Sequence, residues 1–175
     1  LCGTILEHGL QNKIEEDLNN LYIKYKSIKC IYNPFNFEDI REKANEKVEI
    51  IEEDYILSAS AFRPVKRHDI LLDADKKSEI KLKLLLLCNQ TKEIIEMINS
   101  RGLADKVIIL GFKKNPYPII KKAKLLILSS EREGLPTVLL ESLILGTPIV
   151  STNCISGPSE ILTGELSKYL ANVND

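Results

Sequence analysis

Two glutamates flank the expected start of one helix and could hold hydroxyl groups at the two ends of a ligand. Glu133 precedes this helix, and Glu141 lies inside it, eight residues later. Eight residues span about 12 Å at the rise of a helix, and a nucleotide sugar carries hydroxyls on both sides of a diphosphate over a similar length. A carboxylate that accepts such hydrogen bonds contributes about 1.5–3 kcal/mol. The residues alone leave open that Glu133 is a solvated loop residue or a helix cap, and that Glu141 pairs with a lysine on its helix face.

The helix start between these glutamates has the features of an anion site. Gly134 leads into a helix expected over Leu135–Leu145, with Pro136 in the first turn, where the missing N–H of proline is tolerated. The amides of Thr137 and Val138 would point out of the helix start, which carries a partial positive charge. This pattern indicates a phosphate-binding site between two carboxylates.

The elements that must position this site alternate along the chain from residue 28 onward. Continuous apolar runs separated by amphipathic segments are typical of a parallel sheet covered by helices on both faces. The expected fold class is therefore α/β, a Rossmann-like doubly wound parallel sheet whose ligands bind at the carboxyl ends of the strands. Strands are expected at Ile28–Tyr32, Tyr55–Ala59, Leu82–Cys88, Val107–Leu110, Leu125–Leu128 and Pro148–Val150. Helices are expected at Phe37–Lys47, Arg67–Lys77, Thr91–Arg101, Pro118–Ala123 and Leu135–Leu145, and another from Ser159. A further helix-like segment is expected at Ile14–Tyr25.

Composition narrows the class of protein further. The chain has 175 residues, about the length of one domain, and 24 basic against 25 acidic residues give a net charge of −1. This balance argues against nucleic acid or an anionic membrane surface as the main partner. No apolar run approaches the roughly 18 residues that cross a membrane. The four cysteines have no metal-site or redox-motif spacing, which favours buried thiols in a reducing cytoplasm.

Two further motifs carry little functional weight. Asp73 and Asp75 form a DxD pattern, but side chains two positions apart in a helix point in very different directions, so this pair is poorly placed to chelate one ion. The sequence shows no partner residues that would make His68 a general base, and we expect it to pack or hydrogen-bond near Lys66. The sequence therefore indicates no metal site.

At this point the ordered motifs resemble a known family. The segment Ser-x-x-Glu-Gly-Leu-Pro-Thr-Val-Leu-Leu-Glu-Ser at 130–142 resembles the E-x(7)-E signature of the retaining, family-four-type glycosyltransferases of the GT-B fold. The blocks at 146–152 and 157–162 are similar to those that follow it in the family, and 31–35 resembles the entry into the family's C-terminal, donor-binding domain. The match is especially close to enzymes that build lipopolysaccharide or capsule.

The resemblance implies roles for individual residues of a donor site. Glu133 would contact hydroxyls of the transferred sugar, and Glu141 would contact the ribose hydroxyls. The helix start, from Gly134 and Leu135 to Thr137 and Val138, would hold the diphosphate. The loop at Gly111-Phe112 would line the nucleobase, although Phe112 could equally be a core plug at a strand end.

Two departures from the family pattern affect this site. Family members carry an Arg and, five residues later, a Lys that neutralise the diphosphate; Lys66 matches the Lys, but Ala61 stands at the Arg position. Arg63, two residues further on, could substitute from the same loop, and both basic residues could instead lie in solvent. Cys88-Asn89-Gln90-Thr91 replaces the family's usual glycines after a strand, with Thr91 as a possible helix N-cap.

The implied function is the donor-binding half of a retaining glycosyltransferase that moves a sugar from a nucleotide diphosphate sugar, expected to be a UDP-sugar, to a cell-surface glycan without a metal or cofactor. Residues 1–27 would lead in from a separate N-terminal, acceptor-binding domain, and 28–175 would bind the nucleotide sugar. We expect the isolated chain to bind donor with little or no transfer, and a cytoplasmic enzyme that could lie at the inner face of the membrane. The alternative is a non-catalytic nucleotide-sugar binding module that acts as a regulatory or partner subunit.

Overall fold

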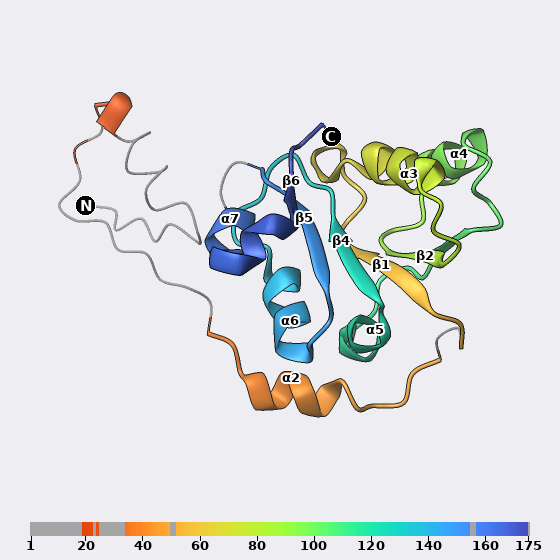
Figure 1. Cartoon of the computed structure of the whole chain (residues 1–175), viewed down its shortest axis with the longest axis horizontal. Helices are drawn as coiled ribbons and strands as arrows, with labels where there is room; N and C mark the ends of the chain where they lie inside the picture. Colours follow the sequence, from red (N-terminus) through yellow and green to blue (C-terminus); the bar gives the residue numbers. More distant parts are fainter. Residues whose placement is uncertain (1–18, 23, 25–33, 50–51, 155–156, 175) are drawn as a thin grey trace.

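A single sheet of parallel strands forms the centre of the molecule (Figure 1). The computed structural model describes residues 19–22, 24, 34–49, 52–154 and 157–174. Within these residues the sheet has six strands in the order β3-β2-β1-β4-β5-β6, so the chain runs outward from β1 to β3 and then returns to the other side of β1. The strands are β1 (Tyr55–Ala59), β2 (Lys83–Leu87), β3 (Val107–Ile109), β4 (Leu125–Leu128), β5 (Ile149–Thr152) and β6 (Leu170–Ala171).

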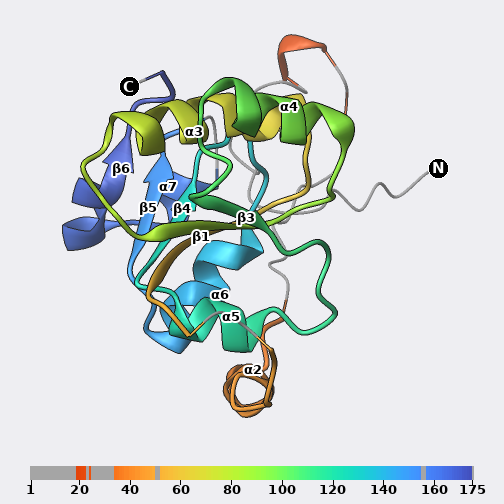
Figure 2. The same ribbon diagram turned by 90° about the vertical axis from the view of Figure 1, so that its right-hand side faces the viewer.

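Helices cover both faces of this sheet (Figure 2). Helices α3 and α4 lie on one face and α5 and α6 on the other, with α2 packed outside α5 and α6. This arrangement confirms the expected Rossmann-like α/β fold. The helices are α2 (Phe37–Lys43), α3 (His68–Lys77), α4 (Lys92–Ser100), α5 (Tyr117–Lys122), α6 (Thr137–Leu145) and α7 (Pro158–Ile161), with 3-10 turns η1 (Pro64–Lys66) and η2 (Gly164–Tyr169).

The strands are apolar throughout because successive side chains enter two different cores. Leu84 and Leu86 of β2 pack with α3 and α4, whereas Leu85 packs with α5 and α6. This burial on both faces is the reason for the continuous apolar runs in the sequence. In α4, Ile94 and Ile98 are buried but Ile95 is exposed, because adjacent helical residues are turned by about 100°.

The expected elements are present with shifted ends. Helix α6 begins at Thr137 rather than Leu135, because the residue before a proline disfavours the helical conformation. Strand β6 was not expected, since it has only two residues. The predicted strand Ile28–Tyr32 lies outside the described residues, as does all but 19–22 and 24 of the segment assigned to 1–27. Among the described helices, none has the length and apolar character needed to cross a membrane.

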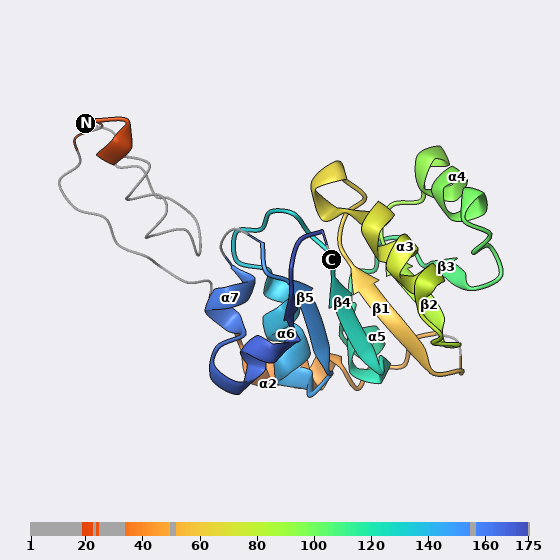
Figure 3. The ribbon, with the colours of Figure 1, turned by 45° about the horizontal axis from the view of Figure 1, so that its top comes forward.

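The loops after β1 and β4 lie side by side at the carboxyl edge of the sheet (Figure 3). The backbone amide of Glu131, after β4, donates to the carbonyl of Val65 in η1, at 2.8 Å. Because the strand order changes direction between β1 and β4, this edge is where a doubly wound fold opens a crevice for ligands.

Candidate functional site: a cavity at the carboxyl edge of the sheet

A cavity of about 310 Å³ lies at the carboxyl ends of three neighbouring strands, against the start of α6. Its walls come from the segments that follow β1, β2 and β3 and from the first turns of α6. The fold thus brings together residues from four distant parts of the chain. The lining includes Ser60, Ala61, Cys88, Asn89, Gly111, Phe112, Lys113, Pro116, Thr137, Val138 and Glu141.

Glu141 supplies the carboxylate of this cavity. It is half-buried in the second turn of α6, and burial raises its pKa above the ordinary value for a glutamate. The charge of Glu141 also contributes, after burial, to the raised pKa of Tyr117, which places the Tyr117 ring nearby at the start of α5. A carboxylate with limited access to water is a strong acceptor for hydroxyl groups of a ligand.

The start of α6 presents backbone donors to the same cavity. Pro136 is the N-cap, and no side chain caps the helix start. The first amides of a helix have no partner inside the helix, and Thr137 and Val138, which carry two of them, line the cavity. The partial positive charge at this end favours an anion. The cavity therefore combines an anion site with a hydroxyl acceptor.

Glu133 and Lys66 form an ion pair next to this helix start. The Lys66 Nζ and Glu133 Oε1 atoms lie 2.6 Å apart, and their side chains are 21% and 9% exposed. The hydroxyl of Ser130 donates to the same Glu133 oxygen at 2.5 Å, and the hydroxyl of Ser129 donates to the Lys66 carbonyl at 2.8 Å. The structure thus brings Lys66 and Glu133 together, and their roles in donor binding stay predictions.

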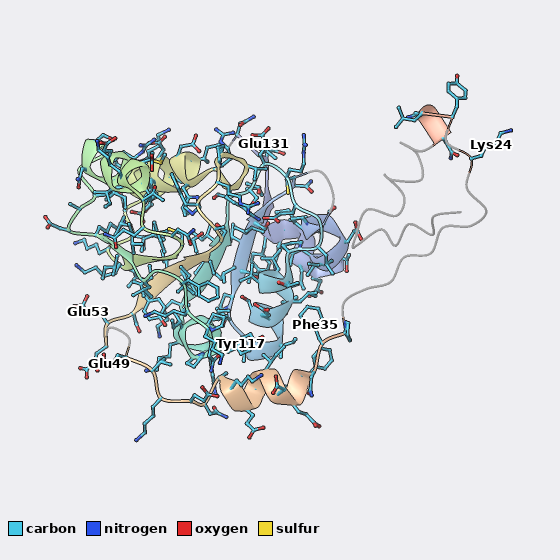
Figure 4. All side chains as sticks on the ribbon, turned by 180° about the vertical axis from the view of Figure 1, so that it is seen from behind. Lys24, Phe35, Glu49, Glu53, Tyr117 and Glu131 are labelled. Carbon is cyan, nitrogen blue, oxygen red and sulfur yellow. The ribbon has the colours of Figure 1, made fainter. Side chains whose placement is uncertain are left out.

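Arg67 ties the loop that carries Lys66 to the loop that carries Glu133. Its guanidinium donates to Asp69 at 3.0 Å and lies 3.4 Å from Glu131, labelled in Figure 4. The hydrogen bond with Arg67 lowers the pKa of Asp69. Arg67 adopts a left-handed conformation, with φ of 49°, which costs a residue with a Cβ about 1–2 kcal/mol. These contacts offset that strain and fix the two loops relative to each other.

Arg63 lies apart from the cavity that contains Glu141. It is exposed and lines a separate, wider cavity of about 770 Å³, together with His68, Glu93 and Arg132. Ala61 lines the Glu141 cavity, so no guanidinium occupies the Arg position of the family pattern. The role of Arg63 as a substitute for the family's diphosphate-binding Arg stays a prediction.

Phe112 is at the mouth of the cavity and not in the core. Its side chain is 85% exposed, so the alternative that Phe112 plugs the core is wrong. Of the residues after it, Pro116 also lines the cavity. Asn115 instead donates to the Lys43 carbonyl at the end of α2, at 2.9 Å. Tyr117, at the start of α5, lies near α2 in Figure 4.

His68 and the two aspartates of the DxD pattern have structural partners. The buried His68 ring packs edge-on against Phe62, with centroids 5.3 Å apart, and burial lowers its pKa. Asp73 pairs with Arg101 at 2.7 Å and Asp75 with Lys106 at 2.8 Å. In the part of the chain that the structure describes, no group of three or more His, Cys, Asp or Glu side chains could hold a metal ion.

The sequence interpretation missed several residues of the site. Ser60, Asn89 and Lys113 line the cavity but were not assigned roles. Their position directly after β1, β2 and β3 is the signal that could have identified them, since ligands of such sheets bind there. The side chains of Cys88 and Cys154 are buried, as expected for these two cysteines, and burial raises the pKa of Cys88 to about 11.

The chain is similar in sequence to known glycosyltransferases. A family model described as "Glycosyl transferases group 1" matches residues 39–175. A Campylobacter jejuni N-acetylgalactosamine-N,N'-diacetylbacillosaminyl-diphospho-undecaprenol 4-alpha-N-acetylgalactosaminyltransferase is 29% identical over 167 residues, which are 94% of this chain and 46% of that protein. Lipopolysaccharide 1,6-galactosyltransferase of Escherichia coli is 27% identical over 175 residues, 95% of this chain and 48% of that protein.

Solved structures show the same fold. A glycosyltransferase from Rickettsia africae superposes with a TM-score of 0.78 at 18% identity, over 95% of this chain and 48% of that one. Anabaena HepE in complex with UDP superposes with a TM-score of 0.72 at 18% identity, over 95% of this chain and 50% of that one. The chain spans about half the length of the curated relatives it matches. By its match over most of its length, the chain belongs to the group 1 glycosyl transferases.

Proposed function

We propose that this chain is the donor-binding half of a retaining glycosyltransferase that transfers a sugar from a UDP-sugar to a cell-surface glycan. The observation that carries the proposal is the cavity in which Glu141 and the first turn of α6 meet, with the Lys66–Glu133 pair beside it. The relatives named as acting on lipopolysaccharide and on a diphospho-undecaprenol glycan support the acceptor class. The HepE complex supports UDP as the nucleotide.

The donor would lie along the cavity with its nucleoside end at Glu141. The two oxygens of Glu141 would accept hydrogen bonds from the ribose hydroxyls, and the loop at Gly111-Phe112 would lie against the nucleobase. The diphosphate would then reach the amides of Thr137 and Val138. The family resemblance implies this order, and the position of Glu141 one turn along α6 from those amides supports it.

Lys66 would donate a hydrogen bond to the diphosphate while it keeps its ion pair with Glu133. A lysine ammonium has three donors, so one can remain with Glu133 Oε1 while another reaches a phosphate oxygen. Glu133 has a second oxygen, which would accept hydroxyl hydrogen bonds from the transferred sugar. In this proposal the ion pair would hold the sugar and the diphosphate on adjacent groups.

The proposed reaction needs positive charge where the leaving group forms. The bond between the anomeric carbon and the diphosphate oxygen breaks, and the acceptor oxygen forms its bond on the same face of the sugar. The acceptor proton passes to the departing phosphate oxygen. Negative charge accumulates on the diphosphate, and fixed donors at Lys66 and at the helix start lower the barrier. In this proposal no side chain of the chain acts as a dedicated base and no metal takes part.

Calorimetric titration with UDP and UDP-sugars tests the proposal. We expect saturable binding that Glu133→Ala and Glu141→Ala each weaken, with Glu165→Ala as a control because Glu165 is exposed on η2 away from the cavity. Glu141→Ala should weaken both ligands, whereas Glu133→Ala should weaken UDP-sugars more than UDP. If neither variant changes binding, the site assignment is wrong.

A second set of measurements separates the enzyme from the non-catalytic binding module. A longer protein that carries this domain and transfers sugar in the presence of EDTA supports the enzyme. Donor binding without transfer by that longer protein supports the module, and strict dependence on added Mn²⁺ contradicts the metal-free mechanism.

A further inference from the structure

The end of β5 and the residue before α7 contact the loop that carries Glu133. The hydroxyl of Thr152 donates to the carbonyl of Ser130, in the Glu133 loop. Burial and then the charge of Glu133 raise the pKa of the Cys154 thiol, which places that thiol near the Glu133 carboxylate. Thr152 at the end of β5, together with Cys154 and Gly157 before α7, forms what we call the backing segment of the Glu133 loop.

Gly157 approaches the Glu133 loop so closely that it leaves no room for a side chain. Its φ is +82°, a conformation that residues with a Cβ rarely adopt. A Cβ built on Gly157 would overlap the carbonyl oxygen of Gly134 and would lie 2.7 Å from Cδ of Pro136. The carbonyl belongs to the backbone, so no rotation of a side chain can relieve the overlap.

The atoms that Gly157 touches connect the two functional parts of the site. Gly134 follows Glu133 directly, and Pro136 is the N-cap of α6. Any outward movement of Gly134 and Pro136 would therefore carry both the Glu133 carboxylate and the leading amides of α6 with it. The positions of the Glu133 carboxylate and of these amides therefore depend on the distance between the backing segment and this loop.

We propose that Gly157 is a positioning residue of the donor site: because it has no side chain, the backing segment can approach Gly134 and Pro136 closely enough to set where Glu133 and the first turn of α6 lie. This inference rests on the proposed function. It assigns to Gly157 a role in donor affinity although the residue itself does not line the cavity.

The test compares Gly157→Ala with two other glycine-to-alanine variants. These also place an alanine at a positive φ, but their Cβ atoms overlap no other atom. Gly102 and Gly164 also have positive φ, +71° and +58°, and a Cβ on either would meet no atom within 4 Å. We expect all three variants to lose stability, and only Gly157→Ala to weaken UDP binding, by about tenfold or more, since displacements on the order of 1 Å disturb such sites strongly. UDP affinity is measured by calorimetry well below each unfolding midpoint.

Amide chemical shifts of Gly134–Val138, recorded without nucleotide, give a readout that does not depend on the proposed function. We expect Gly157→Ala to shift these signals and Gly102→Ala and Gly164→Ala to leave them in place. If wild-type chain binds no UDP, the proposed function fails, and these shifts alone decide whether Gly157 positions the loop. If wild type binds and Gly157→Ala matches it in affinity and shifts, the inference is overturned.

Thr152→Val covers the case in which Gly157→Ala does not fold. This variant removes the hydroxyl that donates to the Ser130 carbonyl and keeps the size of the side chain. We expect a folded protein with several-fold weaker UDP binding and shifted signals in the Glu133 loop. Unchanged affinity and unchanged shifts would show that the backing segment does not position the site.

Discussion

At the scale of single residues, the burial of Glu141 leads to a prediction of how the proposed donor site responds to pH. Burial raises its pKa, so Glu141 takes up a proton at a higher pH than an ordinary glutamate. Protonation removes the charge that strengthens hydrogen bonds from ribose hydroxyls. We therefore expect UDP affinity to fall as the pH is lowered through this raised pKa, and Glu141→Gln to lose that part of the pH dependence and about tenfold in affinity at neutral pH.

Calorimetry across the acidic range measures this effect, with Glu165→Gln as the control. The same shift has a consequence for stability: the folded chain binds a proton that the unfolded chain has already lost, so the contribution of Glu141 to stability is greatest below its ordinary pKa and declines as the pH rises through the raised one. Glu141→Gln should remove that decline. Identical pH profiles for wild type and Glu141→Gln would contradict the assignment.

The Lys66–Glu133 ion pair allows a prediction about coupling. Both side chains are largely buried, at 21% and 9% exposure, so removal of one partner leaves a charge with little water around it. We expect Lys66→Met to lower the free energy of unfolding by about 1–3 kcal/mol. A double-mutant cycle with Glu133→Gln should give a coupling of about 1 kcal/mol or more.

The exposed pair Lys92–Glu96, at 3.6 Å on α4 with side chains 86% and 64% exposed, is the matched control. Its coupling should be about 0.5 kcal/mol or less. The cycles are measured by urea unfolding at neutral pH. Equal coupling for the two pairs would show that the Lys66–Glu133 contact is a surface interaction.

The sequence identified these site residues by spacing but not their partners. Glu133 and Glu141 could be predicted because both belong to one loop and the helix that follows it. The Lys66–Glu133 pair joins residues 67 positions apart, and only the crossing from β3 back to β4 brings their loops together. For the same reason the sequence could not show that Arg63 lines another cavity than Glu141.

At the scale of elements, Tyr55 connects the central strand to a helix and controls stability at alkaline pH. Its hydroxyl, in β1, donates to the Ile119 carbonyl in α5 at 2.7 Å, and burial raises its pKa to about 12. Tyr55→Phe should lower the free energy of unfolding by about 1 kcal/mol near neutral pH. In wild type the contribution of this group is present below the ordinary tyrosine pKa and is lost as the pH rises toward 12.

Thermal unfolding at neutral and alkaline pH measures both effects. Tyr169→Phe is the control, because Tyr169 is 40% exposed. The difference between wild type and Tyr55→Phe should shrink as the pH rises above the ordinary pKa of tyrosine. A difference that stays constant with pH would show that Tyr55 does not resist ionisation in the folded chain.

Elements were predictable where they coincide with a continuous apolar run or an amphipathic segment. Strands β1 and β4 have the predicted bounds because each is a short apolar run between turn residues. Strand β6 has two residues, Leu170 and Ala171, and its pairing with Ser151 and Thr152 of β5 depends on the fold. Helix α2 ends at Lys43, although the helical spacing of its residues runs on to Lys47. The spacing alone does not show where a helix loses its packing partners.

At the scale of the whole molecule, all proposed donor contacts lie at one edge of one sheet. The cavity is lined by the segments after β1, β2 and β3 and by α6, and the Lys66–Glu133 pair lies beside them. An acceptor must approach the same edge, and the relatives that act on glycans are about twice the length of this chain. In the proposed function the acceptor wall would belong to another domain of a longer enzyme.

The last prediction follows from the proposed division of the site between two domains. The 175-residue chain should bind UDP and UDP-sugars but release no UDP when a glycan acceptor is added, because a bound donor without a positioned acceptor lacks the orientation that accelerates transfer. A coupled assay for released UDP measures this, alongside calorimetry on the same sample to show that the donor is bound. Transfer by this chain alone would mean that both substrates meet on a single Rossmann-like domain, with the acceptor held by groups such as those of the wider cavity near Arg63 and Arg132.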